Sequence, residues 1–119
     1  MTSRLSHISV DSGDAYAQSR WWAQVLGMQE DPEDPNEPGH EECMIFSPDG
    51  RTRILFIEVP EDKQVKNRLH FDLRPVDRTR DQEVERVLAL GASQVADQRR
   101  RDGAGWVVLA DPYAPPVTD

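Results

Sequence analysis

The sequence predicts an α+β domain made of two pseudo-symmetric modules, each with the order strand, helix, strand, strand, strand. The first observation behind this prediction is a repeat, because His-Ile-Ser-Val at 7–10 returns as His-Phe-Asp-Leu at 70–73. The second is that each copy precedes a helix-like stretch that ends in Leu-Gly, at 26–27 and at 90–91. The two halves therefore repeat one supersecondary unit at nearly the same spacing.

The remaining strands also correspond, since Met-Ile-Phe at 44–46 matches Val-Val-Leu at 107–109. One module alone would leave the inner face of its small sheet uncovered, whereas two modules together enclose a shared cleft. We therefore expect a single domain over residues 1–119, with module 1 at about 1–62 and module 2 at about 67–119. A curled mixed sheet is expected to surround the cleft, with a helix on each outer face.

The first module is predicted element by element. Residues 4–10 alternate as a strand, and Asp11 is expected to cap a helix that ends at Gly27. Three prolines and seven acids in 30–42 predict an exposed loop. Two strand-like segments flank a Pro-Asp-Gly turn, which is a strong signature of a hairpin: 43–47 and 53–59. In the second of these strands, alternation is expected to place Ile54, Phe56 and Glu58 on the cleft side.

The second module begins with a predicted strand at 68–74, whose apolar side is Leu69, Phe71 and Leu73 and whose polar side is His70, Asp72 and Arg74. Thr79 and Gln82 form a capping box for a helix that ends at Gly91. Short strands are expected at 93–95 and 106–110. Pro115 and Pro116 are hostile to a central strand, so the last strand of this module is expected to be missing, displaced or supplied by a partner.

Composition excludes several classes of function. The formal net charge of −8 argues against nucleic acid and anionic membranes as partners. No apolar run is long enough to span a membrane, and the start of the chain does not resemble a signal peptide. The single cysteine, Cys43, excludes an intramolecular disulfide and fits a reducing compartment. We therefore expect a cytoplasmic protein.

Nearly the whole chain resembles the vicinal oxygen chelate superfamily, which includes glyoxalase I, bleomycin-resistance proteins and extradiol dioxygenases. The resemblance is closest to glyoxalase-like domains of the actinobacterial type. It is carried by four segments: 5–10 (LSHISV), 21–28 (WWAQVLGM), 68–73 (RLHFDL) and 108–112 (VLADP). These motifs are specific for the fold, whereas the superfamily hosts many chemistries.

The resemblance implies where metal ligands would lie. His7 falls at the ligand position of the first strand, His70 at the matching position of the second module, and Glu58 at a carboxylate position of glyoxalase I. A fourth ligand is expected near Thr118, which is a poor one. Two imidazoles and a carboxylate suit Fe(II), Zn²⁺, Ni²⁺ or Mn²⁺, and Glu58 could act as a base. The other expected pocket residues are Phe56, Asp72, Arg74 and Trp106.

Three functional hypotheses remain open at this point. The leading one is a protein of the glyoxalase, bleomycin-resistance and dioxygenase type that binds a small organic molecule in the cleft, as a metal-dependent lyase, isomerase or dioxygenase. Because the fourth ligand is lacking, we favour a form without metal over one with metal. The second hypothesis is a non-catalytic protein that sequesters an antibiotic or toxin. The third is a protein that only dimerises, and a homodimer is expected because the second sheet is incomplete.

Overall fold

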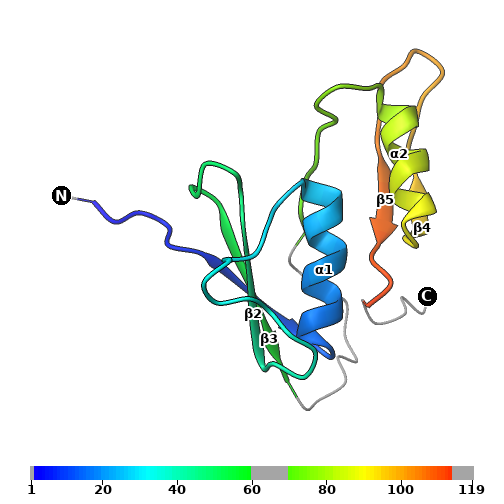
Figure 1. Ribbon diagram of the computed structural model, residues 1–119. Coiled ribbons are helices and arrows are strands. Elements are labelled where there is room, and N and C mark those ends of the chain that lie inside the picture. Colours follow the sequence, from blue (N-terminus) through cyan, green and yellow to red (C-terminus); the bar gives the residue numbers. More distant parts are fainter. Residues whose placement is uncertain (1, 60–69, 114–119) are drawn as a thin grey trace. The chain divides into compact units, whose positions relative to one another are not determined.

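A computed structural model describes residues 2–59 and 70–113 of the chain (Figure 1). The chain divides into two compact units, Met1–Asp62 and Lys63–Asp119. Each unit combines helix with strand, which confirms the α+β class predicted from the sequence. No helix in the described ranges is long and apolar enough to cross a bilayer.

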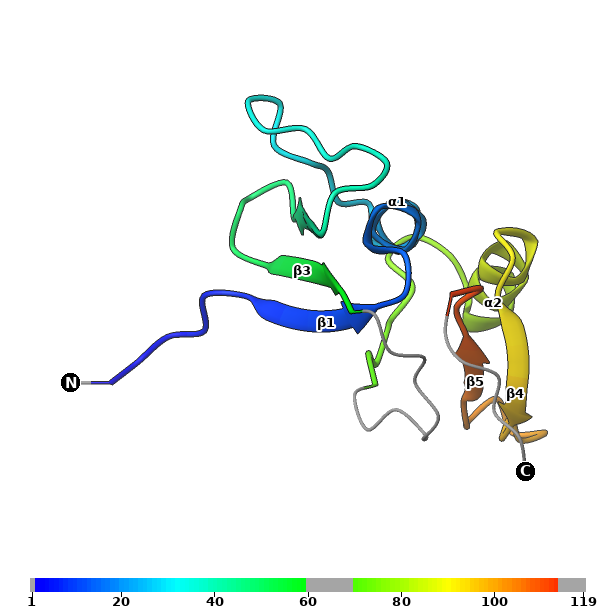
Figure 2. The same ribbon diagram turned by 90° about the horizontal axis from the view of Figure 1, so that it is seen from below.

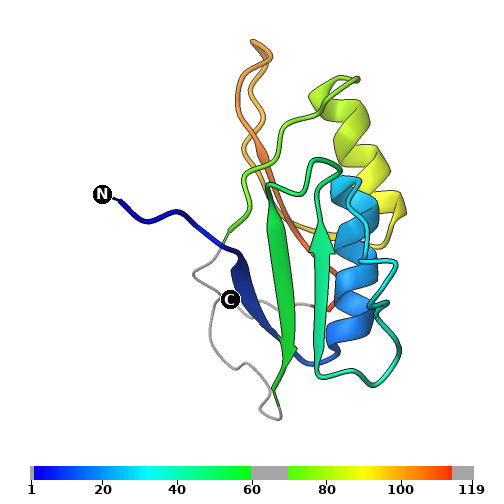
Figure 3. The same cartoon turned by 60° about the vertical axis from the view of Figure 1, so that its left-hand side comes forward.

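The first unit is a three-stranded sheet with one helix. Its elements are β1 (Ile8–Ser12), α1 (Ala15–Leu26), β2 (Glu42–Phe46) and β3 (Arg53–Glu58). β3 lies in the middle, parallel to β1 and antiparallel to β2 (Figure 3). The hairpin between β2 and β3 confirms the predicted turn at 48–50, where Gly50 has a φ of 72°.

Helix α1 begins later than the sequence suggested. Asp14, not Asp11, is the N-cap, and its side chain accepts a hydrogen bond of 3.1 Å from the backbone N–H of Ala17. The predicted strand is displaced in the same direction, because β1 continues to Ser12 and takes Asp11 into the sheet. The end of α1 is as predicted, with Gly27 in the left-handed conformation at a φ of 66°.

One face of the β1–β3–β2 sheet forms the core of the first unit. Its buried side chains alternate along the strands and come together in register, since Val10 and Cys43 both stand opposite Phe56. Helix α1 packs against β2 and β3, and its buried Ser19 side chain partly offsets the rise that burial causes in the pKa of the Cys43 thiol, so this buried face is the one that α1 covers (Figure 2). Phe56 is 0% exposed and is therefore a core residue on the helix side. The sequence predicts that Phe56 faces the cleft, whereas the register places it on the side of the sheet that α1 covers.

The segment between α1 and β2 runs along the edge of the sheet. Gln29 forms an isolated antiparallel bridge with Phe46 of β2. Asn36 holds the segment in place, because its side chain donates a hydrogen bond of 2.9 Å to the carbonyl oxygen of Met44. Most residues of 30–42 are exposed, as the prolines and acids predicted.

The second unit consists of α2 (Arg80–Ala89), β4 (Ser93–Asp97) and β5 (Val107–Ala110), with β4 antiparallel to β5. The predicted capping box is confirmed, with hydrogen bonds of 3.2 and 3.0 Å between Thr79 and Gln82. Arg80 joins the start of α2 to the connection between the strands, because its guanidinium donates to three consecutive carbonyl oxygens: those of Gly103, Ala104 and Gly105. These contacts fix the hairpin against the helix.

The predicted strand at 68–74 is not formed in its described part. Residues 70–74 have no regular structure, and Leu73 is 44% exposed. The physical reason is pairing: alternation makes a segment suitable for a strand, but a strand also needs a neighbour to receive its backbone hydrogen bonds. The two sheets of the described residues consist of β1–β3–β2 and β4–β5, and residues 70–74 belong to neither. Leu69, Pro115, Pro116 and Thr118 lie outside the described residues.

Candidate ligand-binding face

The side of the β1–β3–β2 sheet opposite α1 is the open face of the first unit. Its residues alternate with the buried ones, and they are half-buried or exposed. They come from all three strands: Ser9, Asp11, Glu42, Met44, Phe46, Arg53, Leu55 and Ile57. No described element of residues 2–59 covers this face (Figure 2).

The strand register arranges the open face in three rows. At one end Ile57 of β3 lies between Asp11 of β1 and Glu42 of β2. In the middle row Leu55 lies between Ser9 and Met44. The charged and apolar residues therefore occupy defined places on the sheet and are not scattered over it.

The third row holds Arg53 of β3 and Phe46 of β2. The guanidinium carbon of Arg53 lies 5.6 Å from the centre of the Phe46 ring, which verifies that both side chains lie on the same side of the sheet. Its Nε also donates a hydrogen bond of 3.4 Å to the carbonyl oxygen of Gly50. The open face thus has a cationic end, an apolar middle and an acidic end.

His7 lies beside the cationic end. It directly precedes β1, and continuing the register by one residue from the pair Ile8–Ile54 brings it level with Arg53. Alternation back from Ser9 places the half-buried His7 on the open face. Its Nδ1 lies 3.0 Å from the hydroxyl of Ser6.

Glu58 lies at the other end of the sheet and on its other face. It stands opposite Ser12, five residues beyond His7, which is about 16 Å along the strand. Alternation places Glu58 on the helix side with Phe56, and its charge acts on the Cys43 thiol of that side. Burial raises the pKa of this thiol above its usual value, and nearby carboxylates, Glu58 among them, raise it further.

The residues of the first unit do not fit the ligand set that the resemblance implied. A metal ion holds imidazole and carboxylate donors at about 2 Å, so two ligands of one ion cannot lie on opposite faces of a sheet. His7 and Glu58 are separated in that way. Among the described residues, no group of three or more histidine, cysteine, aspartate or glutamate side chains is arranged to hold a metal ion.

The other predicted site residues belong to the second unit. His70, Asp72 and Arg74 are exposed in the segment without regular structure, and Asp72 and Arg74 do not pair with each other. Trp106 precedes β5 and is 60% exposed. The structure therefore presents these side chains to solvent within their own unit, and none is a core residue.

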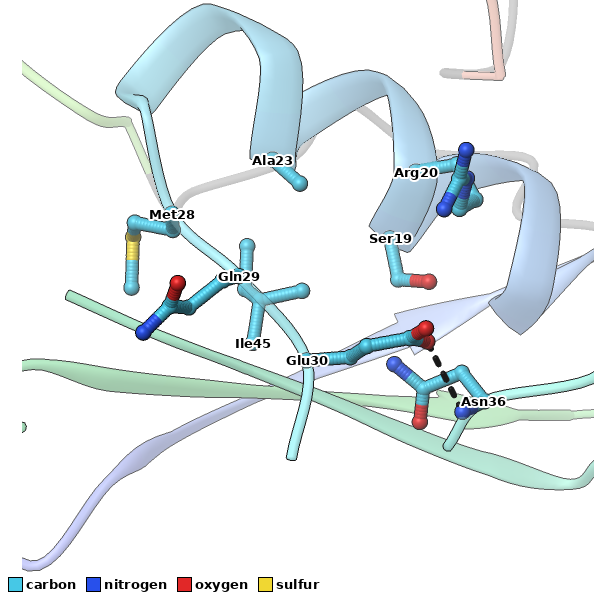
Figure 4. A pocket seen from close by; sticks show the side chains of 8 residues that line it. All are labelled: Ser19, Arg20, Ala23, Met28, Gln29, Glu30, Asn36 and Ile45. Carbon is cyan, nitrogen blue, oxygen red and sulfur yellow. Dashed lines mark hydrogen bonds between the residues drawn. The ribbon is translucent and has the colours of Figure 1, made fainter. Parts of the chain in front are cut away.

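A small cavity lies on the helix side of the first unit, between α1 and the segment that follows it (Figure 4). It has a volume of about 240 Å³, and its floor is Ile45 of β2. Its acidic side chain, Glu30, accepts a hydrogen bond of 2.9 Å from the backbone N–H of Asn36. Because Asn36 also binds the carbonyl oxygen of Met44, these polar groups serve to hold the segment in place.

Sequence reasoning missed the charged residues of the open face. The sequence predicts Asp11 as a helix cap, and it places Glu42 only in the loop 30–42 and Arg53 only at the start of the strand 53–59. The sequence does contain evidence for the position of Glu42. In 42–46, Cys43 and Ile45 alternate with Glu42, Met44 and Phe46, which predicts that Glu42 shares a face with the apolar side chains of Met44 and Phe46. Arg53 is placed on that face only by the register of β3.

The comparisons with known proteins agree with this architecture. FosX of Listeria monocytogenes, a fosfomycin resistance protein in complex with Mn(II) and 1S,2S-dihydroxypropylphosphonic acid, is 21% identical, with a TM-score of 0.68 over 95% of this chain and 85% of that one. FosX of Mesorhizobium loti is 20% identical, with a TM-score of 0.63 over 95% and 86% of the two chains. The oxidase ChaP-H2 is 18% identical, with a TM-score of 0.52 over 95% and 97%.

At these identities the likeness to solved structures concerns the fold alone. No curated protein matches the chain. The family model described as a glyoxalase-like domain matches residues 7–116, which is most of the chain. The resemblance found in the sequence is thereby confirmed, and the chain belongs to the glyoxalase-like domain family.

Proposed function

We propose that this protein binds a small organic molecule on the open face of the β1–β3–β2 sheet. The observation that carries the proposal is the middle of that face, where Met44, Leu55 and Ile57 are only half-buried while polar side chains surround them. An apolar centre with a few placed polar groups is the usual chemistry of a small-molecule site. The FosX complex, with a small phosphonic acid bound, supports this class of ligand for the fold.

A bound divalent metal is a separate proposal. Mn(II) is present in the FosX complex, and His7 is the imidazole that the first unit would offer to such an ion here. Glu58 is left out because it lies on the helix side of the sheet. The expected result of metal analysis after reconstitution with Mn²⁺ is loss of the bound metal in His7→Ala, with retention in Glu58→Gln. Equal metal content in both variants would contradict the proposed role of His7.

Binding without turnover is the second candidate function. It is favoured by the position of Glu58, the carboxylate expected to act as a base, which is about 16 Å from His7 along the strand. On this hypothesis the protein sequesters its ligand and releases it unchanged. Recovery of an unaltered ligand after long incubation with the protein would support sequestration, and a changed product would refute it.

The binding face is tested with a pair of matched variants and anilinonaphthalene sulfonate, a dye with an apolar ring system and one anionic group. Leu55→Asp places a negative charge in the apolar middle of the open face, whereas Leu5→Asp makes the same change at a position that is 74% exposed and precedes the sheet. Dye binding is expected to weaken about tenfold in Leu55→Asp and to stay unchanged in Leu5→Asp, because a carboxylate resists dehydration and repels the sulfonate of the dye. Equal affinity in both variants would refute the proposed face.

A homodimer is also proposed for this protein. The second unit has only two paired strands among its described residues, and an unpaired strand edge invites pairing with another chain. Sedimentation at micromolar concentration is expected to show a species of twice the 13.5 kDa chain mass. A single species of the chain mass would contradict this proposal without affecting the binding face.

A further inference from the structure

We infer that the ligand of the open face carries both charges, with an anionic group at the Arg53 end and a cationic group at the end of Asp11 and Glu42. This inference rests on the proposed function and names the chemical class of its ligand. The class is a small dipolar molecule with an apolar body, such as an ω-amino acid.

The positions of the three rows set the shape of this ligand. Arg53 and Ile57 are four residues apart on β3, so the cationic and acidic rows are about 13 Å apart along the strand. Leu55 lies midway between them on the same face. An elongated molecule along β3 would place its apolar body on Leu55 and Ile57 and its two charged groups near opposite ends of the strand.

The Arg53 guanidinium is held in place by two contacts and is available to bind an anion. Its contacts with the Phe46 ring and with the carbonyl oxygen of Gly50 orient the guanidinium without neutralising it. No carboxylate in the described part of the chain forms an ion pair with Arg53. A guanidinium with fixed geometry and no counter-ion is suited to binding a carboxylate, phosphonate or sulfonate.

The acidic row is likewise without a basic partner. Asp11 and Glu42 flank Ile57 from the two neighbouring strands, and neither pairs with a basic side chain of the described residues. By contrast, the acidic residues Asp81 and Asp97 of the second unit both pair with arginine. An ammonium above Ile57 would lie between two carboxylates on strands about 10 Å apart.

The two ends together also select against singly charged molecules. A simple anion would pair with Arg53 and leave Asp11 and Glu42 without a counter-ion, and a simple cation would pair with the carboxylates and leave Arg53 without one. Only a molecule with both charges satisfies the two ends at the same time. The excess of acidic residues in the whole chain does not explain this arrangement, because it does not account for an arginine at the opposite end of the same face.

The test compares three probes with the same apolar body: ω-aminooctanoate, octanoate and octylammonium. Binding is followed by titration of the methyl NMR signals of Leu55 and Ile57. The dipolar probe is expected to bind about two- to fivefold more tightly than either singly charged probe, which is the usual strength of one exposed ion pair. In Arg53→Glu the order is expected to change, with octylammonium binding most tightly, whereas the control Arg51→Glu in the exposed turn should keep the original order.

The possible results separate this inference from the proposed function. Equal affinity for all three probes, with shifts of the Leu55 and Ile57 methyls, would overturn the dipolar class while retaining the binding face. The same probe order in Arg53→Glu as in the unmodified protein would also overturn it. Absence of any shift at Leu55 and Ile57 with every probe would contradict the binding face itself.

Discussion

Two isoleucines on β3 give opposite predictions, because the strand buries one and leaves the other half-exposed. Ile54 is 3% exposed beneath α1, while Ile57 lies on the open face. Ile54→Ala leaves a cavity in a packed core, and such changes cost about 2–5 kcal/mol of unfolding free energy. Ile57→Ala removes only part of a burial worth about 1.5–3 kcal/mol, so its expected cost is about 1 kcal/mol.

The measurement is urea unfolding followed by tryptophan fluorescence in a Trp106→Phe background. That background leaves Trp21 and Trp22 of α1 as the fluorescent reporters. Their rings are arranged edge to face, with the two ring centroids 5.1 Å apart, on the helix that covers the sheet. A fall of the unfolding midpoint in the Ile54 variant, with little change in the slope, would reflect lost stability.

The same pair of variants also links stability to binding. Ile57→Ala should weaken the binding of ω-aminooctanoate while the protein remains folded, whereas Ile54→Ala should retain binding in its folded fraction. If Ile57→Ala costs as much unfolding free energy as Ile54→Ala, then both faces of β3 are packed. The open face would then not be available to a ligand, and the reasoning for it would fail.

Three further predictions concern local features. Gly103→Ala should cost about 1–2 kcal/mol of unfolding free energy, because the φ of Gly103 is +89°. Gly105→Ala should cost roughly twice that or more, because its Cβ would also overlap the carbonyl oxygen of the residue after β4. Equal shifts of the melting temperature in the two variants would contradict this prediction. Burial raises the pKa of Cys43 above 9.0, so the unfolded thiol ionises first and stability should fall as the pH rises past about 9, a slope that Cys43→Ala should remove. The hydrogen bond from Arg99 holds the pKa of Asp97 at about 2, so the Asp97 carboxylate stabilises the hairpin above pH 3.8, and this stabilisation is lost as the pH falls through about 2. Amide exchange at 98–105 should accelerate over that pH window in the unmodified protein and not in Asp97→Asn.

The local signals in the sequence were sufficient for most elements. Gly27 ends α1 and the pair Thr79 and Gln82 begins α2, because caps depend on a few neighbouring residues. The strand at 68–74 is predicted from alternation and from the repeat of 7–10 at 70–73, and it is not formed over 70–74. Strand formation depends on a partner that is distant in sequence, which alternation does not reveal.

The faces of β3 could not be determined from β3 itself. Residues 54–57 are four apolar side chains in succession, so either alternation gives a plausible core. The neighbouring strands resolve the ambiguity, because Cys43 and Val10 are buried and both stand opposite Phe56. The alternation predicted from the sequence puts Phe56 and Glu58 on the ligand side of β3. The observed register puts Leu55 and Ile57 there instead.

The exchange of faces also changes which residues define the chemistry of the site. The histidine repeat directed attention to His7 and His70, and only His7 lies on the open face of the first unit. The register adds a guanidinium beside His7 and two carboxylates at the far end of the strand, none of which belongs to the repeat. A site defined by register offers charge complementarity along a strand, whereas a site defined by the repeat would offer a metal. The ligand chemistry of this protein is therefore best sought first among dipolar molecules that fit the length of β3, with metal dependence measured independently.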